Sequence, residues 1–400
     1  MTKEKSTVPR LRFPGFTDAW KQRKLGEVAV VVMGQSPDSK NYTNNPLDNI
    51  LVQGNADLKN GNVEPRVWTT QITKIAEKGD IIVSVRAPVG DVAKTRYKVV
   101  LGRGVAGIKG NDFIYQTLIR MKQFGYWMKL STGSTFESIN SGDIKSSLIP
   151  LPSLPEQEAI GNFFSDLDQL ITLHQRKLDD VKELKKALLQ KMFPKGNGND
   201  FPELRFPEFT DAWKQRKLGE VAEKISQKNL DRQYVETFTN SAEFGIISQR
   251  DFFEKNISSL DNISGYYIVS PDDFVYNPRI SNLAPVGPIK RNKLGRVGVM
   301  SPLYTIFRFS DIHLDFVEKY FDTTIWHRYM ELNGDSGARS DRFAIKDSVF
   351  KGLPIPLPTL PEQEAIGSFF SDLDQLITLH QRQLDHLKLL KKALLQQMFI

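Results

Sequence analysis

Apolar residues recur at steps of three and four, or their sum, along two stretches of the chain, residues 154–193 and 360–399. In the first stretch they fall at Ile160, Phe164, Leu167, Ile171, Leu178, Val181, Leu184 and Leu188. This spacing predicts a long α-helix with one continuous apolar stripe, as in a coiled coil. Ser153 and Glu156 indicate a capping box at the start of the first helix, and the second stretch opens in the same way.

A helix of about 38 residues spans ~57 Å and cannot bury its apolar stripe within itself. The economical solution is for the two helices to pack together, antiparallel around a pseudo-twofold axis. His174 and His380 occupy equivalent positions on the predicted seam. They either fix the register of the helices as polar seam residues or bind a metal ion as a pair, although no other His or clustered carboxylate joins them.

The two helical stretches belong to a tandem repeat. Residues 154–193 and 360–399 are identical at 34 of 40 positions, and the shorter segments 11–29 and 204–222 are identical at 18 of 19. The segments between these elements have diverged almost completely. The contrast indicates that the flanking elements do one job twice, whereas the variable segments do two different jobs.

Both variable segments have the pattern of a mixed α/β domain. Short runs with strand character, such as DIIVSV in the first and DFVYNP in the second, alternate with turns and precede helical stretches. The expected fold class is therefore α/β (α+β), with two globular domains joined by two long antiparallel helices. The expected boundaries are a first variable domain over residues 1–153, a first long helix over 154–193, a linker over 194–203, a second variable domain over 204–359 and a second long helix over 360–400.

Composition narrows the class of protein. The chain of 400 residues has no Cys, which excludes disulfides and Cys-type zinc sites and favours a reducing, cytoplasmic compartment. No apolar run approaches the ~18 residues of a membrane span, so we expect no membrane partner. The net charge of +7 fits a polyanionic partner such as double-stranded DNA.

Basic residues cluster within both variable domains, and polar Gly-rich turns follow them. Lys and Arg on such edges are typical of phosphate contacts, and Ser, Thr, Asn and Arg on loops suit the reading of base edges in the major groove. Ordinary solvated loops are the alternative. The candidate DNA-binding residues of the first domain are Arg86, Lys94, Arg96, Lys98, Arg103, Ser134, Thr135 and Asn140. Those of the second domain are Arg279, Lys290, Arg291, Lys293, Arg296, Arg339 and Arg342.

Several catalytic signatures are incomplete. Gly102, Gly104 and Gly107 match G-x-G-x-x-G, but no helix opens at these glycines, so they do not predict a dinucleotide site. Asn277-Pro278 departs from the signature of amino-methyltransferases, because Arg279 follows. The sequence has no P-loop, no nuclease core and no metal-ligand spacing of His. We therefore expect no catalytic residues and no bound metal or cofactor in this chain.

The repeated IPLP-x-LPEQEAIG-x-FFSDLDQLI, the two variable domains and the GQSPDSKNY at Gly34–Tyr42 together resemble the DNA specificity subunits of type I restriction–modification systems. The second domain lacks a GQSPDSKNY opening. The resemblance implies that each variable domain is a target recognition domain for one half of a bipartite DNA site, and that the helices act as a ruler for the spacer between the halves.

The resemblance also implies partner subunits. Two modification subunits, which bind S-adenosylmethionine and methylate adenine, would dock on the helices, and restriction subunits that use ATP and Mg²⁺ would join the assembly. The candidate partner-binding residues are Phe163, Phe164, Leu167, Leu170, Phe369, Phe370, Leu373 and Leu376. Two other hypotheses stay open: a coiled-coil scaffold with no DNA role, and a methyltransferase or nuclease that acts alone.

Overall fold

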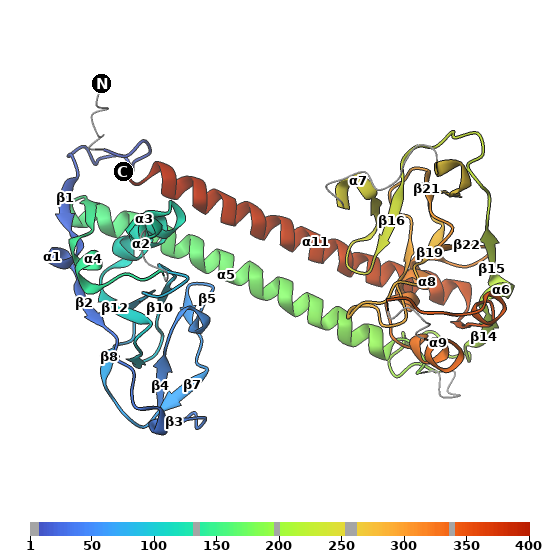
Figure 1. The fold of residues 1–400 in the computed structure, drawn as a ribbon, viewed down its shortest axis with the longest axis horizontal. Helices are drawn as coiled ribbons and strands as arrows, with labels where there is room; N and C mark the ends of the chain where they lie inside the picture. The colour runs from blue at the N-terminus through green and yellow to red at the C-terminus, as the bar shows by residue number, and fades with distance from the viewer. Residues whose placement is uncertain (1–7, 131–136, 196–200, 253–261, 336–340) are drawn as a thin grey trace. The chain divides into compact units, whose positions relative to one another are not determined.

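The computed structural model describes residues 8–130, 137–195, 201–252, 262–335 and 341–400. The chain divides into two compact units (Figure 1): unit 1 comprises Met1–Lys177 with His380–Ile400, and unit 2 comprises Leu178–Leu379. The long helices α5 (Leu154–Lys191) and α11 (Leu360–Gln397) each contribute one part to both units. We call the globular part of unit 1 that precedes α5 head 1, and the part of unit 2 between residues 204 and 359 head 2.

The two predicted helices are confirmed, and they pack antiparallel. In unit 1, Lys391 Nζ of α11 lies 2.6 Å from Asp168 Oδ1 of α5, and Lys388 Nζ lies 3.4 Å from Gln175 Oε1. Unit 2 contains the equivalent pair with the duplicated residues exchanged, Lys185 and Asp374, at 2.5 Å. Leu184, which the sequence placed in the apolar stripe, is 51% exposed and does not belong to the buried seam.

Head 1 is built on two sheets, with strand orders β2-β12-β9-β10-β6-β5 and β3-β7-β4-β11-β8, and a separate β1-β13 pair. The strands are β1 (Lys21–Lys24), β2 (Val30–Met33), β3 (Tyr42–Thr43), β4 (Asn49–Val52), β5 (Leu58–Lys59), β6 (Asn62–Val63), β7 (Val67–Thr69), β8 (Lys74–Ala76), β9 (Ile81–Ser84), β10 (Val92–Lys94), β11 (Val99–Leu101), β12 (Val105–Lys109) and β13 (Leu148–Leu151). The helices are α1 (Leu25–Val28), α2 (Asp112–Gln123), α3 (Tyr126–Leu130) and α4 (Ser141–Ser146). Helix α2 lies between the larger sheet and α5, so Ile81, Phe113 and Phe164 share one core (Figure 1).

Head 2 has a sheet of order β15-β22-β19-β20 and three strand pairs, β14-β23, β16-β17 and β18-β21. The strands are β14 (Lys214–Lys217), β15 (Ala222–Ile225), β16 (Phe238–Ser241), β17 (Gly245–Ser248), β18 (Tyr267–Val269), β19 (Phe274–Tyr276), β20 (Ile289–Arg291), β21 (Gly298–Met300), β22 (Thr305–Phe309) and β23 (Pro354–Leu357). The helices are α6 (Leu218–Val221), α7 (Gln249–Phe252), α8 (Leu314–Phe321), α9 (His327–Asn333) and α10 (Asp347–Phe350). Helix α8 packs on α11 as α2 packs on α5, with Phe316 and Phe370 fully buried together.

The duplicated short element clamps the start of the long helix in each unit. In unit 1, Arg12 donates to both carboxylate oxygens of Glu156, at 2.6 and 2.8 Å, and Trp20 Nε1 donates to the same group at 3.3 Å. In unit 2, Arg205 and Trp213 hold Glu362 in the same way. The predicted capping box is therefore wrong for the carboxylate, which binds a distant arginine and not the helix terminus.

The far end of the other long helix also meets the short element. The backbone N–H of Leu11 donates to the carbonyl oxygen of Gln397, at the end of α11, and that of Leu204 donates to the carbonyl oxygen of Lys191, at the end of α5.

Within the described ranges, no helix combines the length and the apolar character that crossing a membrane requires.

Candidate nucleic-acid interface

Head 1 carries an exposed arginine just beyond the end of strand β9. The carbonyl oxygen of Val85 accepts a hydrogen bond from the backbone N–H of Ile139 at 3.0 Å, and Arg86 forms an isolated antiparallel bridge with Ser138. Ile139 is buried, whereas Arg86 is exposed. The buried isoleucine thus anchors the loop that contains Ser138 beside an arginine side chain on the surface.

A second exposed arginine of head 1, Arg103, lies on the turn between β11 and β12. The backbone N–H of Val85 donates to the carbonyl oxygen of Gly104, so the turn that carries exposed Arg103 adjoins Arg86. Two glycines permit this close approach: a Cβ on Gly104 would lie 2.0 Å from the carbonyl oxygen of Gln53, and one on Gly34 would lie 1.9 Å from that of Gly102. The first two glycines of the G-x-G-x-x-G pattern therefore lie in a close backbone contact ahead of strand β12, and the third, Gly107, lies within that strand.

The segment Gly34–Tyr42 begins at this same edge of head 1. The hydroxyl of Ser36 accepts a hydrogen bond from the backbone N–H of Arg103 at 3.1 Å. No local sequence pattern connects these two residues, which are 67 positions apart.

Head 2 repeats the arrangement of loop and strand. The carbonyl oxygen of Pro278 accepts a hydrogen bond from the backbone N–H of Phe343 at 2.7 Å, and Arg279 forms an isolated antiparallel bridge with Arg342. Phe343 is buried in the position that Ile139 takes in head 1, and Arg279 is exposed. Two arginines therefore meet on neighbouring backbones where head 1 has an arginine and a serine.

Ion pairing separates the predicted basic residues into two groups. No carboxylate of the described residues forms an ion pair with Arg86, Arg96, Arg103, Arg279 or Arg342. These guanidinium groups can therefore meet phosphate or base edges without first breaking an internal pair.

The other predicted cations are engaged within their own heads. Lys94 pairs with Asp112, Lys98 with Glu77, Lys290 with Asp322, Lys293 with Glu318 and Arg296 with Glu236. Arg291 contacts Asp272, Asp315 and Glu318, and its side chain is only 13% exposed. Arg291 is therefore held inside head 2 by three carboxylates, which speaks against the prediction that it contacts DNA, whereas Lys290, at 27% exposure, stays a prediction. Two carboxylates of α8, Asp315 and Glu318, pair with Arg291 and Lys293, and they lie more than 20 positions away in the sequence.

Three of the candidate residues, Ser134, Thr135 and Arg339, lie outside the described residues. Asn140 is described, and it caps helix α4: its Oδ1 accepts hydrogen bonds from the backbone N–H groups of Gly142, at 2.7 Å, and Asp143, at 3.1 Å. Asp143 reciprocates with a hydrogen bond from the backbone N–H of Asn140. The Oδ1 atom is thus engaged by the helix, and the prediction that the exposed Asn140 reads bases stays a prediction.

We expect Asn140→Ala to lower the free energy of unfolding by about 1 kcal/mol, because loss of the side-chain oxygen leaves two backbone N–H groups without their acceptor. Urea denaturation of the chain measures this loss. Asn140→Asp keeps the acceptor and is the control. An alanine variant of unchanged stability with an altered DNA target would contradict the assignment as a cap.

The predicted partner-binding residues also divide by burial. Phe164, Leu167 and Phe370 lie in the cores of their units, where they support the heads, so they are not available to a partner. Phe163, Leu170 and Leu376 are 37%, 41% and 37% exposed. Phe369 and Leu373 are half-buried against the core of unit 2. The exposed residues remain candidates for docking.

The two seam histidines meet within unit 1. The ring centroids of His174 and His380 are 5.8 Å apart, and the Nδ1 atom of each is buried without a hydrogen bond to the described residues. No group of three or more His, Asp or Glu suited to a metal ion occurs among the described residues. Both interpretations of the pair therefore stay as the sequence left them.

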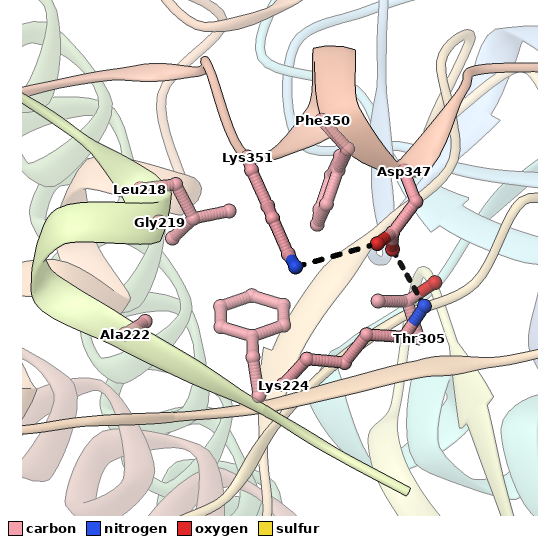
Figure 2. Close-up of a pocket in the computed structure, with 9 residues that line it drawn as sticks. Leu218, Gly219, Ala222, Lys224, Thr305, Asp347, Phe350 and Lys351 are labelled. Atoms are coloured by element: carbon pink, nitrogen blue, oxygen red, sulfur yellow. Dashed lines mark hydrogen bonds and ion pairs between the residues drawn. The ribbon is translucent and has the colours of Figure 1, made fainter.

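Figure 2 shows a pocket of head 2 that lies between α6 and α10. Its one carboxylate, Asp347, lies 2.5 Å from Lys224 Nζ and 3.5 Å from Lys351 Nζ. The hydrogen bond from Lys224 is the main cause that lowers the pKa of Asp347 below its ordinary value. The shift favours the ionised carboxylate, which lies between the ammonium groups of these two lysines.

Comparison with known proteins agrees with this architecture. The family model for the type I restriction modification DNA specificity domain matches residues 17–183 and 210–389. Each match begins in a duplicated short element and ends in a duplicated long helix, so each covers one half of the tandem.

Two curated relatives come from Methanocaldococcus jannaschii. A putative type I restriction enzyme MjaX specificity subunit is 34% identical over 180 residues, which cover 42% of this chain and 41% of that protein. The type I restriction enzyme MjaVIII specificity subunit is 24% identical over 258 residues, 62% of this chain and 60% of that protein. The chain thus matches about half the length of these relatives.

Solved structures share the fold. The S subunit of a type I restriction–modification system from M. genitalium matches 98% of this chain and 99% of its own, with a TM-score of 0.63 at 15% identity. A chain from a structure on complex assembly and conformational transition of the type I R-M system matches with a TM-score of 0.50 at 19% identity, over 95% of this chain and 97% of its own. The expected fold class is confirmed, and this chain belongs to the family of type I restriction–modification DNA specificity domains.

Proposed function

We propose that this chain is the DNA-recognition subunit of a type I restriction–modification complex, and that each head reads one half of a bipartite DNA site. The observation that carries the proposal is the exposed arginine that each head presents at the same place, Arg86 in head 1 and Arg279 in head 2, beside a loop of different composition. Arginine in the major groove recognises guanine through two hydrogen bonds, and unlike loops give unlike half-sites. Arg103 and Arg342 complete the two surfaces.

The long helices are proposed to set the spacing and to dock the modification subunits. Exposed leucines occur on them in equivalent pairs: Leu170 with Leu376, Leu173 with Leu379, and Leu184 with Leu390. Near-identical apolar surfaces on both helices suit two copies of one partner. In this proposal the chain supplies recognition, the modification subunits bind S-adenosylmethionine, and the restriction subunits use ATP and Mg²⁺.

We expect Arg279→Ala to weaken DNA binding by the reconstituted complex by about 1–3 kcal/mol, and to relax the sequence of one half-site only. Arg86→Ala should relax the other half-site. Adenine methylation mapped across a host genome reports both halves of the target. Arg296→Ala is the control, because Arg296 is a basic residue of head 2 whose guanidinium already pairs with Glu236.

Two results would contradict the proposal. A methylation pattern that is the same with and without this chain would remove its role in DNA recognition and favour a scaffold. Binding of S-adenosylmethionine by the isolated chain would favour an enzyme that acts alone.

A further inference from the structure

One carboxylate in each unit joins three elements. In unit 2, Asp374 of α11 accepts a hydrogen bond from Lys185 Nζ of α5 and another from Lys319 Nζ of α8, both at 2.5 Å. In unit 1, Asp168 of α5 binds Lys391 of α11 at 2.6 Å and Gln116 Nε2 of α2 at 2.8 Å. Each aspartate therefore touches the opposite long helix and its own head.

A glycine two turns earlier supplies a second point of attachment for the head. A Cβ on Gly161 would lie 2.9 Å from Asp112 Cβ and 3.1 Å from the backbone nitrogen of Phe113, so the first turn of α2 rests directly on α5. Gly367 is equally close to the first turn of α8. Since positions i and i+7 lie on one face of a helix, the glycine and the aspartate contact the head helix at two separate points. These two points act beside the apolar core that each head helix shares with its long helix, and together they fix the direction of the head helix.

The head residue that binds the aspartate differs between the units: it is Gln116 in head 1 and Lys319 in head 2. The aspartate is therefore the feature that the two units share. Gln116 is 1% exposed and neutral, and Lys319 is 2% exposed and charged. Burial alone would lower the pKa of Lys319, but Asp322, Asp374 and Glu318 together raise it above its ordinary value. Head 1 thus binds its aspartate through a neutral hydrogen bond, and head 2 binds the equivalent aspartate through a buried ion pair.

We propose that Asp168 and Asp374 are positioning residues, which hold each head at a fixed angle to the two long helices and so set the number of unread base pairs between the half-sites. The inference rests on the proposed function. A domain of about 150 residues is ~30 Å across, so a tilt of about 10° displaces its far surface by ~5 Å. This displacement exceeds the ~3.4 Å rise of one base pair.

The test uses the complex of this chain with its modification subunits, in a host that lacks other adenine methylation. Sequencing of methylated adenines gives the half-site bases and the spacer length. For Asp374→Asn we expect unchanged half-site bases. We expect the preference for the original spacer over spacers one base pair longer or shorter, measured as a ratio of methylation, to fall at least about tenfold. Asp372→Asn is the matched control, because Asp372 is exposed and lies two residues earlier on the same helix.

A second variant guards against loss of the fold. Lys319→Gln copies the neutral arrangement of Gln116 and should keep the original spacer. Lys319→Gln with Asp374→Asn removes the buried charge together with its partner, so that only Lys185, which is 20% exposed, loses a carboxylate, and it should relax the spacer. The inference is overturned if Asp374→Asn, alone and combined with Lys319→Gln, lowers the amount of methylation but leaves the original spacer as the only one used. The aspartate would then be only structural. If the unaltered chain directs no two-part target at all, the proposed function itself fails, which is a different result.

Discussion

Glu362→Gln should lower the free energy of unfolding of unit 2 by about 3–5 kcal/mol, because it breaks a buried ion pair from one side. The side chain of Glu362 is fully buried, and Arg205, which donates to both of its oxygens at 2.7 Å, is 12% exposed. Glutamine would keep one acceptor but would turn an NH₂ group toward the guanidinium. Arg205, which is largely enclosed, would then lose its counter-charge. The indole of Trp213 donates to the same carboxylate and reports the change directly by fluorescence.

Hydrogen exchange assigns the loss to a unit. We expect faster exchange in head 2 and the parts of the long helices that belong to unit 2, with head 1 unchanged. Glu364→Gln is the control, since Glu364 is exposed two residues further along the same helix. Glu156→Gln should shift the effect to unit 1, where Arg12 and Trp20 form the equivalent clamp. A loss below about 1 kcal/mol would show that the clamp contributes little net stability, as some buried ion pairs do.

The clamp also shows what sequence reasoning could not reach. The apolar periodicity predicted both long helices and their antiparallel packing, because that signal is local and repeated. Ser153 and Glu156 matched a local capping pattern, but the stronger partner of Glu156 is Arg12, 144 positions earlier in the sequence. The available clue was the near-identity of the short elements, which preserve Arg and Trp in both copies. That identity indicated a shared role without indicating the partner.

The candidate interface was only partly predictable for the same physical reason. Clusters of basic residues were visible, but whether a cation is free depends on carboxylates that the fold brings close. Arg291 is neutralised by acids of α8, whereas Arg279, only 12 positions earlier, has no such neighbour among the described residues. The pairing of Arg279 with Arg342 joins backbones far apart in the sequence. The strand-like runs DIIVSV and DFVYNP form β9 and β19, and Arg86 and Arg279 follow these two strands at equivalent places.

Phe399→Ala should cost unit 1 about 3–5 kcal/mol, although residue 399 is the most distant of its core residues from head 1 in the sequence. Phe399 is 4% exposed, and its ring stacks on Phe113 at a centroid distance of 5.0 Å and packs against Trp20 and Phe164. Alanine would leave a cavity among rings that belong to three separate segments and cannot close together. Because these rings join the end of α11 to head 1, reading of the half-site that belongs to head 1 should weaken as well.

The duplicated chain offers a crossed control for this prediction. Phe193, at the end of α5, occupies the equivalent place in unit 2, 5.4 Å from Phe316 and 6.0 Å from Trp213 by ring centroids. Phe193→Ala should therefore destabilise unit 2 and weaken the other half-site. Leu389→Ala removes an exposed side chain of α11 and should change stability by less than about 0.5 kcal/mol. Equal destabilisation of both units by either phenylalanine variant, in hydrogen exchange and in methylation, would contradict this prediction. It would show that the end of each long helix does not support one head alone.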